Sequence, residues 1–318
     1  MSVTLNGGVT FGGGFSFTAA PPAGATAGWY VGGSPGSGAL STIDRVIFAT
    51  DTATATARGP LSQGTFALSG SGTLDNGWFS GGNPGFFTTV NRITYATDTA
   101  TTSIRGPLNA GRYMAASSSD GSTYSWFSAG FSSSAPTQSS QVSRITYATD
   151  TATASARGPL AAGKYDHFAT GTTSYGWHIG GRLAGGNSSI NRITYANDTP
   201  TASIRGPLSA AQYGGGAVTD GTTYGWVAGG FISNTQRIVY ATDTDTATTR
   251  GTLPQRTLKM GATCDNTYGW FGGGYVLTPA GTISTITRLT YANDTTTTTD
   301  RGFLSLARRQ LAGGSGVQ

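Results

Sequence analysis

Short segments of alternating apolar and polar residues recur along the whole chain, separated by turns rich in glycine. One typical unit predicts four strands, at residues 113–119, 123–130, 143–149 and 154–158. A tight hairpin at Asp120–Gly121 joins the first two, and Ile145 and Tyr147 are expected on one face of the third. No window keeps the 3.6-residue apolar period of a helix. The pattern therefore predicts an all-β protein made of four-stranded antiparallel units.

This unit recurs six times, at intervals of 45 to 52 residues. A first arginine opens each copy, at Arg45, Arg92, Arg144, Arg192, Arg237 and Arg288. An aspartate follows six residues later, at Asp51, Asp98, Asp150, Asp198, Asp243 and Asp294. A second arginine follows after 13 residues, at Arg58, Arg105, Arg157, Arg205, Arg250 and Arg301. The tryptophans keep the same step, at Trp29, Trp78, Trp126, Trp177, Trp226 and Trp270. Repeats of about 48 residues with four strands each predict a β-propeller.

The two ends of the chain predict how the propeller closes. The chain enters its first copy at the second strand, residues 28–33, and residues 306–317 form a first strand without a second. Pairing these two segments completes a sixth blade and leaves no unpaired inner edge. We therefore expect a six-bladed propeller over residues 23–318, preceded by an extended N-terminal arm and proline linker over residues 1–22.

The repeat resembles the kelch family of propeller proteins. The counterparts of the kelch pattern are Arg112 on the first strand, Tyr124 with Trp126 and a Gly-Gly pair on the second, and Tyr95 with Asp98 on the third. The kelch tryptophan of the fourth strand is replaced by Ile104, Ala156 or Ile204, and the first-strand arginine is lost at Gln212. The phrase YATDTAT…RGPL is also similar to kelch-like repeats in virion proteins of tailed phages, especially phages of cyanobacteria. This resemblance implies a structural protein of a virion.

Charge is sparse and follows the repeat. The chain has 14 Asp, no Glu, two Lys and 17 Arg, and the twelve repeat arginines outnumber the six repeat aspartates by six. The net charge of +5 is thus spread around the ring, unlike the one-sided basic stripe of a nucleic-acid-binding protein. We expect the aspartates to accept backbone N–H bonds at hairpin tips, the arginines to lie between blades, and the tryptophans to form the core between blades.

The inventory of reactive side chains argues against an enzyme. His167 and His178 are the only histidines and Cys264 the only cysteine, so neither a copper nor a zinc centre can be assembled, and no metal or cofactor is expected. Cys264 is interpreted as a small packing residue. The carboxylates outside the repeat that a glycosidase would need lie in turn sequences, at Asp75, Asp120 and Asp220.

Binding residues are expected in the loops between second and third strands, because these loops vary from copy to copy. The residues that stand out from their polar surroundings are Phe86, Phe87, Phe131, Arg182, Phe231 and Tyr275. Antiparallel blades place these loops at the same end of the ring, where aromatic rings and arginine fit a sugar or a protein neighbour. The alternative is that each aromatic ring folds back onto its own blade.

The N-terminal arm is the second unrepeated part. Its apolar pairs, among them Val9 with Phe11 and Phe15 with Phe17, fit short strands that add to the sheet edge of a partner. The alternative is a disordered tail. The N-terminus has neither the basic start nor the apolar core of a signal peptide, and no run of residues is long enough to cross a bilayer.

Together these features predict a non-enzymatic virion protein, assembled in the host cytoplasm and present in several copies per particle. It would be a tail fibre, a tail tip or a capsid decoration that is held by its arm to other virion proteins and attaches to host-surface glycan. Two alternatives remain open: an architectural protein that cements neighbouring virion subunits, and a carbohydrate-active enzyme on a kelch scaffold.

Overall fold

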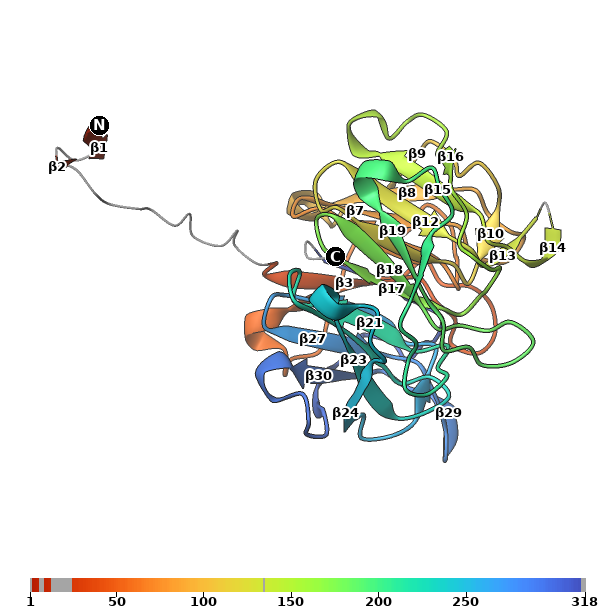
Figure 1. Cartoon of the computed structure of the whole chain (residues 1–318). Coiled ribbons are helices and arrows are strands. Elements are labelled where there is room, and N and C mark those ends of the chain that lie inside the picture. Colours follow the sequence, from red (N-terminus) through yellow and green to blue (C-terminus); the bar gives the residue numbers. More distant parts are fainter. Residues whose placement is uncertain (1, 6–8, 13–24, 134, 316–318) are drawn as a thin grey trace.

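The computed structural model describes residues 2–5, 9–12, 25–133 and 135–315. This part of the chain is all-β, as predicted: short antiparallel sheets make up the body (Figure 1), and the only helices in the described ranges are six single 3-10 turns. These turns cover Phe48–Thr50, Tyr95–Thr97, Tyr147–Thr149, Tyr195–Asn197, Tyr240–Thr242 and Tyr291–Asn293. Within the described residues no helix is long and apolar enough to cross a membrane.

Six four-stranded antiparallel sheets dominate the described residues, and we number them I to VI along the chain. Sheet I contains β32 (Ala312–Gly314), β3 (Ala27–Val31), β4 (Ile43–Ile47) and β5 (Thr56–Ala57). Sheet II contains β6 (Ser69–Gly72), β7 (Asn76–Ser80), β8 (Val90–Thr94) and β9 (Ser103–Arg105). Sheet III contains β11 (Ala116–Ser119), β12 (Tyr124–Ser128), β15 (Val142–Thr146) and β16 (Ser155–Arg157).

The other three sheets repeat the same order of strands. Sheet IV contains β17 (Phe168–Gly171), β18 (Tyr175–Ile179), β19 (Ile190–Thr194) and β20 (Ser203–Arg205). Sheet V contains β21 (Gly216–Thr219), β22 (Tyr224–Ala228), β23 (Asn234–Val239) and β24 (Thr248–Thr252). Sheet VI contains β26 (Gly261–Cys264), β27 (Tyr268–Gly272), β30 (Thr285–Thr290) and β31 (Thr299–Phe303).

Three smaller sheets complete the described structure. One contains β10 (Arg112–Tyr113), β13 (Phe131–Ser132) and β14 (Ala135–Gln138), and another contains β25 (Thr257–Leu258), β28 (Tyr275–Leu277) and β29 (Ala280–Thr282). The third pairs β1 (Ser2–Leu5) with β2 (Val9–Gly12). Figure 1 shows β14 and β29 on the side of the body away from the start of β3.

Burial explains why the strands of one sheet differ in composition. In a second strand such as β12, four consecutive residues are buried, so both faces of the strand are covered by neighbouring sheets. In a fourth strand such as β20, the middle residue Ile204 is 69% exposed. The sheets therefore pack face to face through their inner strands and leave the outer strands in water.

The strand boundaries differ from the sequence prediction by up to three residues. The third strand of sheet III ends at Thr146, and Tyr147 begins a 3-10 turn. Ile145 and Tyr147 nevertheless pack in one cluster with Trp78, as the prediction of a shared face implies. The predicted first strand, residues 113–119, is split: Tyr113 belongs to β10, and β11 begins at Ala116. The cause of this split is Met114, whose φ of 54° turns the chain out of the extended conformation.

The first strands of the six sheets contact one another in cyclic order, through β6, β11, β17, β21, β26 and β32, and β32 contacts β6. Just before these strands, six equivalent residues join their backbones: Ala67, Met114, Asp166, Gly214, Lys259 and Gln310. Each N–H donates to the carbonyl oxygen of the equivalent residue in the preceding sheet, and Ala67 donates to Gln310 at 2.7 Å. All six residues have positive φ, a conformation that costs roughly 1 kcal/mol outside glycine. The continuous ring of backbone hydrogen bonds thus offsets the local strain of these residues.

The composite sheet predicted from the two ends of the chain is present. β32 pairs with β3 so that Trp29 lies opposite Gly314, and β3 continues into β4 as expected. Arg308 strengthens this closure, because its guanidinium contacts Asp44 of β4 at 2.8 Å with both side chains fully buried.

Candidate functional site

The repeated arginines, aspartates and tryptophans meet between neighbouring sheets. Asp98 of sheet II accepts a hydrogen bond from Trp29 Nε1 of sheet I at 2.9 Å. The same carboxylate lies 3.2 Å from Arg45 Nη1 and 3.4 Å from Arg58 Nε, both also of sheet I. We call this arrangement a seam. It recurs at Asp150, Asp198, Asp243, Asp294 and Asp51, the last of which joins sheet VI to sheet I.

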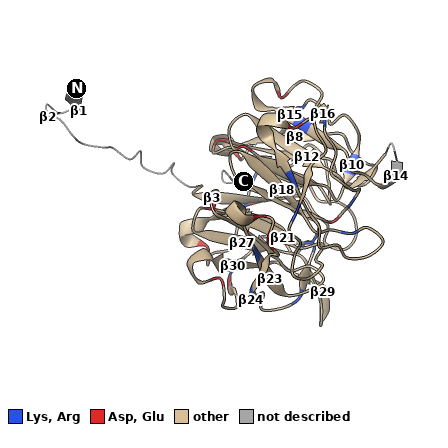
Figure 2. Cartoon of the chain, viewed as in Figure 1, with Lys and Arg blue, Asp and Glu red and all other residues tan. Residues whose placement is uncertain are grey.

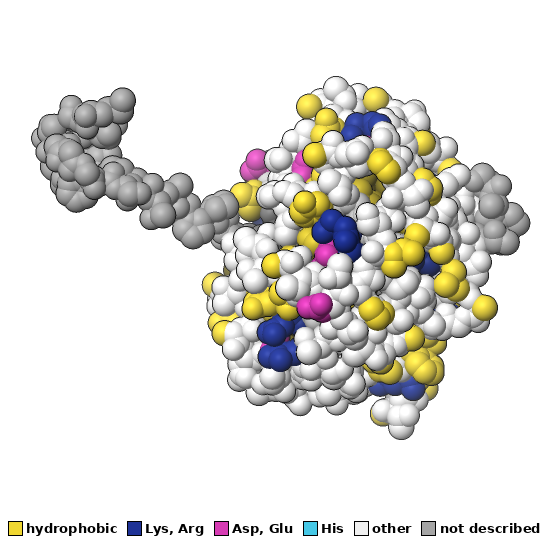
Figure 3. Space-filling model, in the orientation of Figure 1, with side chains coloured by type: hydrophobic (Ala, Val, Ile, Leu, Met, Phe, Trp, Pro, Cys, Tyr) yellow, Lys and Arg dark blue, Asp and Glu magenta, His cyan; other side chains and the backbone are white. Residues whose placement is uncertain are grey.

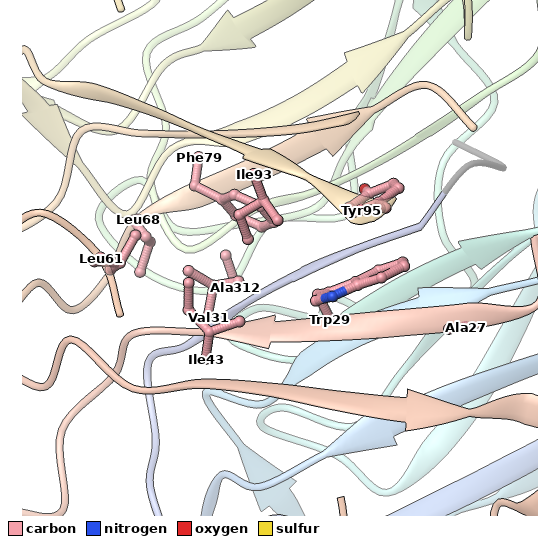
Figure 4. Packing of buried hydrophobic residues seen from close by; sticks show 10 residues of the cluster. All are labelled: Ala27, Trp29, Val31, Ile43, Leu61, Leu68, Phe79, Ile93, Tyr95 and Ala312. Carbon is pink, nitrogen blue, oxygen red and sulfur yellow. The ribbon is translucent and has the colours of Figure 1, made fainter. Parts of the chain in front are cut away.

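Each seam also stacks two aromatic rings. Trp29 lies 3.7 Å from Tyr95, ring centroid to centroid, with the ring planes 7° apart. Figure 4 shows the two rings lying one over the other. The other five seams have the same stack, with centroid distances of 3.9 to 4.1 Å. The tyrosine and the aspartate come from one 3-10 turn and its C-cap, so a single turn covers the tryptophan ring and accepts its N–H.

The expected role of the aspartates needs correction. They were predicted to hold their own hairpin tips through backbone N–H groups, but the partners of the Asp98 carboxylate are side chains of the adjacent sheet. It is the main-chain oxygen of Asp98 that accepts a backbone bond, from Gly59 of sheet I at 2.8 Å. A Cβ at Gly59 would collide with the carbonyl oxygen of Ala100, which explains the repeated Arg-Gly pair.

The seams are structural contacts in which two arginines share one aspartate. Acidic and basic segments adjoin at β8, β15 and β16 in Figure 2. Burial raises the pKa of Asp294, but the hydrogen bonds from Arg250 and Trp226 outweigh it and leave that pKa below its ordinary value. The predicted placement of the arginines and tryptophans between sheets is confirmed.

Aromatic rings and guanidinium groups gather in a different way at the end of the body where the variable loops emerge. Tyr113 contacts Phe86 at 5.0 Å and Phe131 at 5.2 Å, measured between ring centroids. Phe131 continues to Tyr165 at 4.4 Å. Farther along, the Arg182 guanidinium lies 5.4 Å from the ring centroid of Tyr165. These side chains form a continuous band across sheets II, III and IV.

The band continues across sheets IV to VI. Arg182 also lies 4.8 Å from the ring centroid of Tyr213, and Tyr213 stacks on Phe231 with 5.4 Å between centroids. The Arg256 guanidinium in turn lies over Phe231, 4.2 Å from the ring centroid. A separate pair follows, in which Arg309 lies 4.9 Å from the ring of Tyr275.

Most of the binding residues expected from the sequence therefore lie together, because five of the six belong to this band or to the pair beside it. The exception is Phe87, which is half-buried and has no aromatic partner in the described part of the chain. The rings contact the neighbouring repeat as well as their own, so they do not simply fold back. Sequence reasoning missed the residues that link them, namely Tyr113, Tyr165, Tyr213, Arg256 and Arg309. For the tyrosines, the available signal was their recurrence in GRY, GKY and AQY at one position of the repeat.

A narrow cavity runs along the first strands of all six sheets. One part, of about 110 Å³, is lined by the backbone ring residues, among them Asp166 and Lys259, which lie 3.9 Å apart. Burial raises the pKa of Asp166, although Lys259 and Arg182 act in the opposite direction. A second part, of about 100 Å³, lies against the first strands and His167.

His167 lies beside this cavity, and a second buried histidine, His178, shares Ser128 with it. Ser128 Oγ is 2.9 Å from His167 Nε2 and 2.7 Å from His178 Nδ1. Burial, together with the charge of Lys164, lowers the pKa of His178 to about 3. Burial also lowers the pKa of His167 well below its ordinary value. Both rings are therefore neutral at physiological pH and are poor proton acceptors.

The arginine that precedes the first strand of sheet III is also a structural group. Arg112 is buried and donates to the backbone oxygens of Phe127 and Gln141 at 3.3 and 3.0 Å. Lys164 and Gln212 occupy the equivalent positions and likewise donate to backbone oxygens. Burial lowers the pKa of Lys164 to about 8. Exchange among Arg, Lys and Gln is possible here because each supplies N–H donors to nearby backbone carbonyl groups.

The remaining reactive side chains serve the fold. Asp120 and Asp220 each accept three backbone N–H bonds within their own turns, as predicted. Cys264 is fully buried, as expected of a packing residue, and burial raises the pKa of its thiol to about 11. Among the described residues, no three His, Cys, Asp or Glu side chains come together in a way that would hold a metal ion.

Of the residues expected in the arm, Val9 and Phe11 lie on β2, where Leu5 is opposite Val9 and Val3 is opposite Phe11. Phe15 and Phe17 lie outside the described residues. In comparisons with known proteins, the chain matches no protein-family model, and no curated protein is significantly similar to it.

Proposed function

We propose that the six four-stranded sheets are the blades of a six-bladed, kelch-like β-propeller. Three features support this assignment. The first strands contact one another in cyclic order, the six seams are equivalent, and the backbone ring returns from Gln310 to Ala67. Asp51, near the start of the chain, accepts hydrogen bonds from Trp270 and Arg288 of sheet VI. A closed ring requires such a contact between the last sheet and the first.

We further propose that the protein is a non-enzymatic structural protein of a phage virion, and that it attaches to host-surface glycan through the loop end. The observation that carries the glycan proposal is the band of aromatic rings and guanidinium groups there. Phe231 is 49% exposed, and Phe86 and Phe131 are half-buried, so parts of these rings are open to a ligand. Aromatic surface flanked by polar donors is the usual composition of a binding site.

The virion assignment rests on the resemblance of the YATDTAT…RGPL repeat to phage structural proteins. The arrangement of the body fits a display role in a tail fibre, a tail tip or a capsid decoration. The described body begins at the start of β3, whereas β14 and β29 of the loop end lie on the opposite side (Figure 1). An N-terminal arm that binds other virion proteins would thus leave the loop end free to face the host.

A glycan array tests the attachment proposal. The intact chain should bind a subset of immobilised host-surface glycans, and Phe131→Ala and Phe231→Ala should abolish that binding. Ile204→Ala is the matched control, because it removes an exposed apolar side chain from an outer strand, away from the loop end. Binding should survive in this control.

Other results would overturn the attachment proposal. If no glycan binds and a particle reconstruction buries the loop end against other subunits, the protein cements the particle. If a sugar is converted to product, the protein is an enzyme. If the chain is missing from purified particles, the virion assignment is wrong.

A further inference from the structure

The arginines of this protein divide by their partners. Twelve lie in the seams, two to each aspartate, Arg308 pairs with Asp44, and Arg112 donates to backbone oxygens. Among the described residues, three guanidinium groups remain with neither an acidic partner within 4 Å nor a hydrogen-bond acceptor: Arg182, Arg256 and Arg309. All three lie at the loop end and against aromatic rings. The chain therefore leaves its uncompensated arginines on a single surface.

Two of these arginines enclose a pair of rings. The order is Arg182, Tyr213, Phe231, Arg256, with successive separations of 4.8, 5.4 and 4.2 Å. We call this set the ladder. It spans sheets IV to VI. Arg182 and Phe231 follow the second strands β18 and β22, whereas Tyr213 and Arg256 precede the first strands β21 and β26. The rings hold each guanidinium in place by cation–π contact without neutralising its charge.

Nearby carboxylates do not compensate the ladder. Burial raises the pKa of the Asp166 carboxyl group and the positive charge of Arg182 acts to lower it, but the residue that forms an ion pair with Asp166 is Lys259, at 3.9 Å. In the view of Figure 3, Lys and Arg side chains on the side of β14 and β29 are bordered by hydrophobic side chains and not by Asp or Glu. The ladder is therefore a positively charged, partly apolar surface.

We propose that the ladder binds a carboxylate-bearing sugar of the uronic-acid type. This inference rests on the proposed function, since it names the class of glycan that the loop end recognises. The apolar C–H groups of the sugar would contact the exposed edge of Phe231, whose faces are covered by Tyr213 and Arg256. The carboxylate would accept hydrogen bonds from the Nη atoms of Arg182 or Arg256. Charged hydrogen bonds of this kind are roughly twice as strong as neutral ones, so the acidic sugar is preferred over its neutral counterpart.

The test uses one ligand in two forms. Binding of an oligogalacturonate trisaccharide and of its methyl ester is measured by titration calorimetry with the intact chain. The free acid should bind about tenfold more tightly than the ester, and the difference should shrink as salt is raised. Arg182→Gln and Arg256→Gln should each weaken binding of the acid by about tenfold and leave binding of the ester unchanged.

Arg309→Gln is the matched control, because it removes the same group from the Tyr275 contact outside the ladder. Thermal unfolding of every variant should match the intact chain, since none of the three arginines forms an ion pair. Equal binding of acid and ester, or full acid binding by Arg182→Gln and Arg256→Gln, would overturn the ladder but leave glycan attachment intact. Failure to bind any sugar in either form or on the array would instead overturn the proposed function itself.

Discussion

In a seam, Arg45 and Arg58 lie within 3.4 Å of one carboxylate, and Trp29 is covered by Tyr95 on its face and bound by Asp98 at its N–H. At the loop end, the guanidinium groups face aromatic rings and no carboxylate, and Phe231 is half exposed. In the seams these groups have partners in the adjacent sheet, whereas at the loop end the guanidinium groups have no carboxylate partner. Groups that have partners within the protein stabilise the fold. Guanidinium groups without an acidic partner remain available to bind a ligand.

The seams and the loop end also differ in how they repeat. The six seams use the same residue types, except that Phe48 replaces tyrosine in the seam at Asp51, since each must join one sheet to the next in the same geometry. The loop end varies from phenylalanine to arginine to tyrosine at equivalent positions, after Gly130, Gly181 and Gly274. Variation there leaves the ring intact, because the loops contribute little to the contacts between first strands.

Removal of residues 306–318 should have the largest effect on the seam side of this comparison. It deletes β32, the Gln310 link of the backbone ring and the guanidinium that balances fully buried Asp44. An uncompensated buried charge alone costs about 3–5 kcal/mol, so the product should be unfolded or aggregated. Circular dichroism and size-exclusion chromatography report this outcome. A soluble monomer with an unchanged thermal midpoint would show that closure does not need the C-terminal strand.

Asp98→Ala should have the next largest effect. It leaves Trp29 Nε1 and two guanidinium groups without their acceptor, and we expect a loss of about 2–3 kcal/mol in the free energy of unfolding. The value is lower than for a fully buried pair, because Arg45 and Arg58 keep partial contact with water. Urea denaturation measures the loss, and Asp75→Ala, in an exposed turn, is the control. A loss of glycan affinity without a loss of stability would mean that seams are binding sites after all.

The two buried histidines are neutral and have no acidic partner among the residues that the structure describes. Their burial should make the stability of the fold depend on pH. The pKa of His178 is about 3 in the folded chain and about 6.5 when unfolded, so the unfolded state binds the proton first as the pH falls. Stability should therefore drop by about 2 kcal/mol per histidine between pH 6.5 and pH 5. His178→Phe, which introduces the residue present at the equivalent Phe79 and Phe127, should halve this loss in urea denaturation. An unchanged pH dependence would contradict neutral burial of His178.

Much of the arrangement could be predicted from residues in sequence order. The spacing of Arg45, Asp51 and Arg58 recurs without exception, and strand alternation together with turn residues gave four strands per repeat. The pairing of β32 with β3 could be predicted because the chain begins with a second strand that has no first strand and ends with a first strand that has no second. These features depend on local periodicity, which a sequence displays directly.

The partners of the repeated residues depended on the packing of one sheet against another. Asp98 contacts Arg45 and Trp29, which are 53 and 69 residues away, and no spacing within one repeat reveals that the aspartate reaches across a seam. The ladder is similar, because Arg182 and Arg256 become neighbours of one ring pair only when three sheets lie side by side. The sequence alone determined the four-stranded repeat and the order of its strands, because alternation and turn formation act over a few residues. The tertiary structure decided which charges are balanced, because that depends on distances between sheets.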